Sequence, residues 1–173
     1  MQRAVRFLFS VLLPGLLGCV SMPVAIATTN PVKALAADGR LLGTLTITEQ
    51  QSGFAGITGV IWSIDADGKY HAARFVNERI EPPHKQGRLP TESLRALGKT
   101  MEAELSPLTA RLGQEAEINP RTIVIRFAQR TWTLALPTGQ SIGEAWREHS
   151  RNESDPRYRF LRVVRVFLDN IGE

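Results

Sequence analysis

Apolar residues alternate with polar ones along two stretches of the chain, and this spacing limits the folds that it can adopt. In "LLGTLTITEQ", residues 41–50, Leu45 and Ile47 alternate with threonines, and "ITGVIWSID", residues 57–65, has the same character. A spacing of two residues is typical of a strand that buries one face. The two stretches therefore predict neighbouring strands.

A turn is expected directly after the second strand. "DADGK", residues 65–69, contains an Asp-Gly pair, which favours a tight hairpin turn because glycine accepts a positive φ at little cost. The segment "YHAARFVN" that follows is then a third strand. Asp65 and Asp67 are also spaced like the start of a calcium loop, but the remaining oxygen ligands do not follow at the required spacing.

The second half of the chain mixes helical and strand patterns. "ERIEPPHKQGRLP", residues 78–90, is polar and proline-rich and predicts an exposed loop. A helix capped by Thr91 should follow and end at Pro107. Residues 121–137 predict two strands around a turn at 128–130, and the polar stretch after them has no clear assignment.

The last element is a helix with strong signals at both ends. Asp155 followed by Pro156 is a favourable helix start, and Gly172 is a favourable end. The order is then β-β-β-α-β-β-α, which predicts the α+β class. We expect an antiparallel sheet of about five strands, with the helices on one face.

The N-terminus has the plan of a secretory signal peptide. Residues 1–27 begin with two arginines, continue as an apolar run and end in Ala-Ile-Ala, so cleavage is expected after Ala27. The alternative is "LLGC", which resembles a lipobox and would make Cys19 the lipid-bearing first residue of a membrane-anchored lipoprotein; an uncleaved membrane anchor is a third reading. The expected organisation is a signal peptide over 1–27, a flexible arm over 28–40 and a single α+β domain over 41–173.

If the protein is exported, either to the periplasm or out of the cell, the absence of a cysteine pair bears on how its core is stabilised. Disulfides are common in exported proteins, but Cys19 is the only cysteine in the sequence. No cysteine pair can form, so the core must hold through packing alone.

The sequence carries no recognisable catalytic or metal-binding motif. The three histidines, His71, His84 and His149, lie far apart and match no zinc spacing. Glu115 and Glu117 are better explained as surface charges than as an acid-base pair. The formal net charge of +4 is too small to predict nucleic-acid binding. We therefore expect a non-enzymatic protein without a cofactor or metal.

One short segment draws attention because an aromatic residue stands among glycines. In "SGFAGITG", Gly53 and Gly56 flank Phe54 and Ala55. Glycines allow tight or left-handed backbone, so the segment is suited to a protruding turn or to a bulged entry into a strand. Phe54 then either folds back onto the core, which we favour, or is presented to a partner as an interface anchor.

A wider pattern resembles a known family. "SGFAGITGVIWSID", "GRLPTESLRAL" and "TIVIRFAQRTWTLAL" together resemble the emfourin family, small bacterial inhibitors of thermolysin-like metalloproteases, over about residues 45–136. The resemblance implies a related fold, and it implies protease inhibition as a candidate activity. It also implies Gly53, Phe54, Ala55 and Gly56 as a candidate contact segment. This chain differs by having Ser52, an insertion at 81–87 and the export signal.

Two function classes follow. In the first, the chain is an exported protein-binding module, with inhibition of a secreted metalloprotease by cleft occlusion as the candidate activity. In the second, it is an envelope-associated structural protein or lipoprotein without a protease target. Contact with a membrane is expected only if Cys19 is lipidated or the N-terminus stays uncleaved.

The processing site can be checked directly. Mass spectrometry of the exported protein should give Thr28 as the N-terminal residue, because Ala25 and Ala27 occupy the positions that signal peptidase reads. A lipid-modified N-terminal Cys19 would contradict this prediction while leaving export intact.

Overall fold

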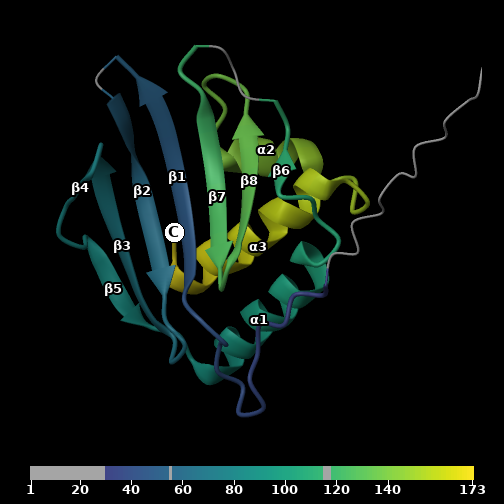
Figure 1. The fold of residues 1–173 in the computed structure, drawn as a ribbon. Coiled ribbons are helices and arrows are strands. Elements are labelled where there is room, and N and C mark those ends of the chain that lie inside the picture. Colours follow the sequence, from purple (N-terminus) through teal and green to yellow (C-terminus); the bar gives the residue numbers. More distant parts are fainter. Residues whose placement is uncertain (1–29, 55, 115–117) are drawn as a thin grey trace, which may run out of the picture.

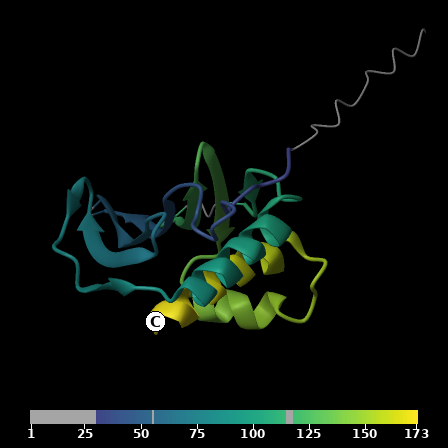
Figure 2. The same cartoon turned by 90° about the horizontal axis from the view of Figure 1, so that it is seen from below.

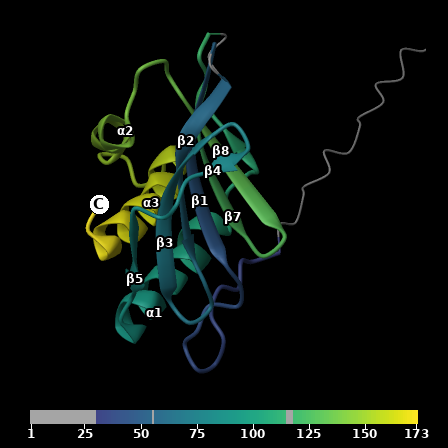
Figure 3. The same ribbon diagram turned by 90° about the vertical axis from the view of Figure 1, so that its left-hand side faces the viewer.

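The computed structural model describes residues 30–54, 56–114 and 118–173 (Figure 1). Within these ranges the chain forms one sheet of eight strands and three helices. The helices lie together on one face of the sheet (Figures 2 and 3). The predicted α+β class and the placement of the helices are thus confirmed. The expected signal segment 1–27, with Cys19, lies outside the described residues.

The strands follow each other in a mostly antiparallel order. Their bounds are β1 Leu45–Gly53, β2 Gly56–Ile64, β3 Lys69–Val76, β4 Arg79–Ile80, β5 Lys85–Arg88, β6 Arg111–Leu112, β7 Arg121–Phe127 and β8 Arg130–Leu136. The order across the sheet is β4-β3-β2-β1-β7-β8-β6, and β5 also pairs with β3. All described pairs are antiparallel except β6 with β8, which is parallel.

The predicted sheet of about five antiparallel strands was therefore too small. The five expected strands are β1, β2, β3, β7 and β8, and the three additional ones have only two to four residues. β4 and β5 lie in the segment predicted as an exposed loop. Strands of two to four residues are too short to show an apolar alternation, and these three form by pairing with β3 or β8.

The helices are α1 Thr91–Leu105, α2 Ile142–His149 and α3 Pro156–Ile171. Asp155 caps α3 by accepting a hydrogen bond from the backbone N–H of Arg157, and Gly172 ends it in the left-handed conformation, as predicted. Thr91 does not cap α1: it is the first helical residue, and Pro90 stands at the cap position without a side-chain hydrogen bond.

Helix α2 was missed by the sequence analysis, although its start has a readable signature. Ser141 and Glu144 form a capping box, in which each side chain accepts a hydrogen bond from the other residue's backbone N–H. Hydrogen bonds from Ser141 lower the pKa of the Glu144 carboxyl below its usual value. The bond from the Ser141 backbone N–H has the larger effect, and the bond from its hydroxyl has the smaller one. Trp146 of α2 then stacks on Tyr158 of α3, with ring centroids 5.5 Å apart.

The core lies between the sheet and the helices. The strand register places Ile47 of β1 between Trp62 of β2 and Ile125 of β7, and all three are buried. Phe160 and Phe167 of α3 are fully buried in the same cluster. We call this side of the sheet the core face and the opposite side, over which no described helix lies, the open face (Figure 2).

The arm expected to be flexible over residues 28–40 is packed in its described part, residues 30–40. Val32 and Ala34 are buried in the core cluster. Glu102 of α1 accepts hydrogen bonds from the backbone N–H groups of Ala34 and Leu35, at 2.8 and 3.1 Å. Gly98 of α1 leaves room for Leu35, since a Cβ there would clash with that side chain. A glycine that weakens the helix thus lets the arm approach it closely.

The docking of the arm can be tested at Glu102. Glu102→Ala leaves two backbone N–H groups without their acceptor, which should lower the free energy of unfolding by about 1–3 kcal/mol. Lys99→Ala, at an exposed position of the same helix, is the matched control and should change stability by less than about 0.5 kcal/mol. Equal denaturation curves for the two variants would show that the arm does not depend on this contact.

Candidate functional site

The Gly-Phe-Ala-Gly segment forms the tip of the β1–β2 hairpin. β1 ends at Gly53 and β2 begins at Gly56, and these two glycines are register partners. Gly56 has a φ of +100°, which confirms the prediction that the segment uses left-handed backbone in a protruding turn. Ala55, the fourth candidate contact residue, lies outside the described residues.

The side chain of Phe54 is fully exposed at this tip. The expectation that it folds back onto the core is therefore wrong. The reason is positional: the hairpin extends beyond the region that the helices cover (Figure 3), so no core lies within reach of the ring. The role as an interface anchor stays a prediction, and the exposed ring is compatible with it.

Asn77 fixes the base of the tip from the β3 side. Its backbone N–H donates to the carbonyl of Ile57 at 2.6 Å, and its side-chain Oδ1 accepts from the N–H of Ile57 at 2.9 Å. Asn77 itself has a φ of 55°, a conformation that asparagine tolerates better than most residues. A Cβ on Gly56 would clash with Asn77 Oδ1, so glycine is required there for this close contact.

The loop before β7 supports the tip from the other side. The backbone N–H of Ser52 donates to the carbonyl of Pro120 at 3.0 Å. The Thr138 hydroxyl donates to the carbonyl of Ile118 in the same loop, at 3.2 Å. The hairpin tip thus stands between two other turns that contact its strands.

Exposed apolar side chains gather at this end of the sheet. The C-terminal ends of β1 and β3 and the N-terminal ends of β2 and β7 lie here. The residues that flank these strand ends are therefore at the same end of the sheet (Figure 1). Among the described residues, five of the six large apolar side chains that are exposed belong to it. We call this set the apolar rim: Phe54, Ile57, Val76, Ile80 and Ile118. The sixth, Leu42, precedes the opposite end of β1.

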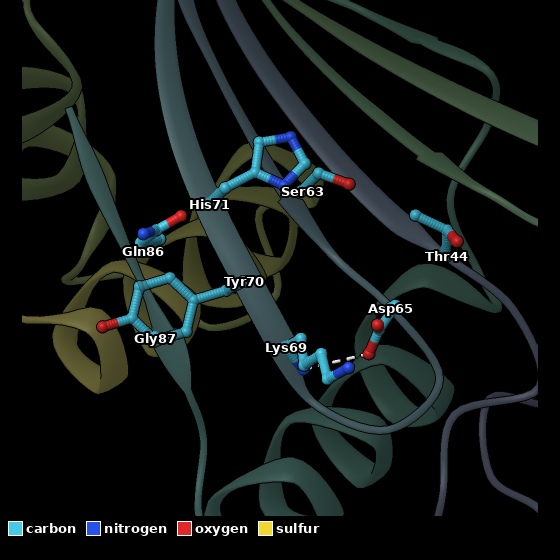
Figure 4. A pocket seen from close by; sticks show the side chains of 8 residues that line it. All are labelled: Thr44, Ser63, Asp65, Lys69, Tyr70, His71, Gln86 and Gly87. Carbon is cyan, nitrogen blue, oxygen red and sulfur yellow. Dashed lines mark hydrogen bonds between the residues drawn. The ribbon is translucent and has the colours of Figure 1, made fainter. Parts of the chain in front are cut away.

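A polar groove lies at the other end of β2 and β3. Its volume is about 620 Å³, and it is lined by Thr44, Ser63, Asp65, Lys69, Tyr70, His71, Gln86 and Gly87 (Figure 4). Ser63 and His71 are register partners on the open face, whereas Tyr70 points to the other side. The β2–β3 turn forms where it was predicted, and Asp65 Oδ1 closes it by accepting hydrogen bonds from the backbone N–H groups of Asp67 and Lys69.

The histidines remain apart in the structure. His71 lies in the polar groove, His84 is 3.9 Å from the carboxylate of Glu173, and His149 Nδ1 is 2.9 Å from Asp155 Oδ2. In the described ranges, no three His, Cys, Asp or Glu side chains gather as metal ligands would. Glu115 and Glu117 lie outside those ranges. No helix among the described residues is long and apolar enough to cross a membrane.

Comparisons with protein families and with curated proteins give no match. No protein-family model matches the chain, and no curated protein is similar to it. The resemblance to emfourins therefore stays a prediction.

The residues around Phe54 were partly missed by the sequence analysis. The glycines predicted the turn, but nothing in the sequence indicated that Asn77 contacts Ile57 across twenty residues. The apolar residues of the rim come from three separate parts of the chain, residues 54–57, 76–80 and 118, and are brought to one end of the sheet only through the pairing of the strands.

The exposure of Phe54 has a measurable consequence. Phe54→Ala should change the free energy of unfolding by less than about 0.5 kcal/mol, because an exposed ring leaves no cavity when removed. Phe127→Ala, at a buried position, is the matched control and should cost about 3–5 kcal/mol. A large loss of stability in the Phe54 variant, measured by chemical denaturation, would contradict the exposed placement of the ring.

Proposed function

We propose that this chain is an exported, non-enzymatic protein-binding module that engages its partner through the apolar rim, with Phe54 as the anchor. The observation that carries this proposal is a fully exposed phenylalanine on a hairpin tip whose base is held by two hydrogen bonds between Ile57 and Asn77. Aromatic side chains are enriched in the cores of protein interfaces.

The exposed apolar side chains around the hairpin tip are better explained by binding to a partner than by exposure that serves no function. A large apolar ring in water loses the free energy that burial would provide, and four further apolar side chains share the same edge. Because Asn77 holds Ile57 through two hydrogen bonds, the base of the hairpin is already ordered before a partner binds, which reduces the conformational entropy lost on binding. Gathered apolar groups on a preorganised turn are what an interface needs.

A secreted metalloprotease is the partner class that we propose. The resemblance to emfourins supports it, as does the expected export, which would bring the two proteins into one compartment. A narrow hairpin with an apolar tip suits entry into a cleft, so inhibition would proceed by occlusion without any reaction and without a cofactor.

The test is a binding and inhibition assay with a panel of secreted metalloproteases. The exported protein should bind at least one of them and reduce its activity. Phe54→Ala should weaken that binding by about 2 kcal/mol or more, a loss of roughly thirtyfold, as for an interface hot spot. Leu42→Ala is the matched control, since Leu42 is also exposed but lies at the opposite end of β1.

Two results would count against the proposal. If Phe54→Ala and Leu42→Ala bound as well as the unchanged protein, the rim would not be the interface. If no protease were bound and no other protein were captured through Phe54, the role as an envelope-associated structural protein would be the better explanation.

A further inference from the structure

The strands carry an uneven share of the charges. Among the described strand residues, only Glu49 is acidic, whereas the basic ones are Lys69, Arg74, Arg79, Lys85, Arg88, Arg111, Arg121, Arg126 and Arg130. The other acidic residues lie on helices, in loops and turns, or outside the described ranges. The sheet is therefore strongly basic, although the net charge of the whole chain is small.

The open face of the sheet holds no carboxylate at its described strand positions. Glu49 pairs with Val60 of β2 and Ile123 of β7, which places it on the core face, where it forms an ion pair with Arg121. Lys69 and Arg88 are register partners on the open face, and Arg126 lies there on β7, in register with Thr46. Cations on this face thus have no acidic neighbour along the strands.

We call Lys69, Arg88 and Arg126 the cationic strip. All three side chains are exposed, and none forms an ion pair with another part of the chain that the structure describes. The register row from Arg126 through Thr46 and Ser63 to His71 crosses three strand spacings, about 14 Å. Lys69 is two residues from His71 on the same face of β3. The strip therefore spans a length that several residues of an extended peptide would cover.

Hydrogen-bonding side chains fill the space between these cations. Ser63, His71 and Gln86 line the polar groove of about 620 Å³ in which Lys69 also lies (Figure 4). Hydroxyl and amide groups at this position can donate to carboxylate oxygens. Asp65, the only carboxylate in the groove lining, already accepts two backbone hydrogen bonds of its own turn.

The same open face ends in apolar side chains near the hairpin tip. The row from Gly59 through Phe75 to Ile80 lies on it, and the ring of Phe75 covers Gly59. Ile57 lies two residues before Gly59 on the same side of β2, and Ile57 and Ile80 both belong to the apolar rim. The open face is thus basic and polar at one end and apolar at the other.

We infer that the open face binds an acidic segment of the same protein partner that the apolar rim engages. The carboxylates of that segment would lie along the cationic strip, while its apolar neighbours would contact Ile57 and Ile80. This inference rests on the proposed function, because it describes the chemistry of the same partner. It adds a second contact area and predicts that the association is sensitive to salt.

A polypeptide fits this face better than another polyanion. Nucleic acids and sulfated polysaccharides would also meet the cations, but their charged backbones offer nothing to Ile57 and Ile80. Binding of single-stranded nucleic acid relies on aromatic rings that stack on the bases. On the open face of the described strands the aromatic side chains are Phe75, which packs over Gly59, and the imidazole of His71.

The experiment uses a fluorescein-labelled acidic peptide, in which a run of glutamates is joined through a Gly-Ser spacer to a run of leucines. Its binding to the exported protein is followed by fluorescence anisotropy at low and high NaCl. The variant Lys69→Gln/Arg88→Gln/Arg126→Gln should bind about tenfold more weakly or worse. The matched control Arg74→Gln/Arg79→Gln/Arg130→Gln removes the same charge from the core face and should keep most of the affinity.

The apolar end is tested separately. Ile57→Ser/Ile80→Ser should weaken binding of this peptide several-fold, yet leave binding of a glutamate-only peptide unchanged. Phe54→Ala should have little effect on either peptide. Failure of the rim as an anchor would therefore appear in the protease assay alone, and failure of the open face would appear in the peptide assay alone.

Three outcomes would overturn the inference. The first is no salt-sensitive binding of the acidic peptide. The second is an equal loss in the open-face and core-face triple variants, which would indicate only a general attraction of the basic sheet. The third is tighter binding of a single-stranded oligonucleotide of equal charge, unaffected by Ile57→Ser/Ile80→Ser, which would indicate a surface for polyanions rather than for a protein.

Discussion

Strand β1 is hydrogen-bonded along its length on both sides, to β2 over Leu45–Gly53 and to β7 over Leu45–Gln51. This double pairing organises the molecule. At its start, the side chains of Leu45 and Ile47 are fully buried against the helices. At its end, the strand leaves the region that the helices cover and carries Phe54 into solvent. One continuous strand therefore runs from the core to the hairpin that carries Phe54, the most exposed aromatic side chain among the described residues.

The helices and the sheet contribute differently to the surface. Glu104 of α1 forms ion pairs with Arg159 and Arg162 of α3, so these arginines have an acidic partner within the helical layer. The sheet has almost no acidic residues, and its open face has none at the described strand positions. Unmatched cations cost little while they stay hydrated, but they attract acidic groups from outside. The open face is thus the side of the sheet on which the cations stay available to acidic groups from outside.

Two glycines show how much of a local sequence signal depends on distant contacts. Gly98 lowers the helix propensity of α1, and the structure shows that it makes room for Leu35 of the packed arm. Gly56 was expected to serve a turn, and it does, but it also allows Asn77 to approach. In both cases the residue type was visible in the sequence, whereas the partner that required it was not.

The sequence by itself determined the five long strands, α1, α3 and the α+β class, because apolar periodicity and the ends of helices are local properties of the chain. It also determined that a turn forms at Gly53–Gly56. Only the tertiary structure decided that β4, β5 and β6 exist, since segments this short become strands through pairing with β3 and β8. The exposure of Phe54, the packing of residues 30–40 on α1 and the gathering of cations on one face depend on which elements lie beside each other. Contacts between residues far apart in sequence leave no periodic trace, and for that reason they had to be found in the fold.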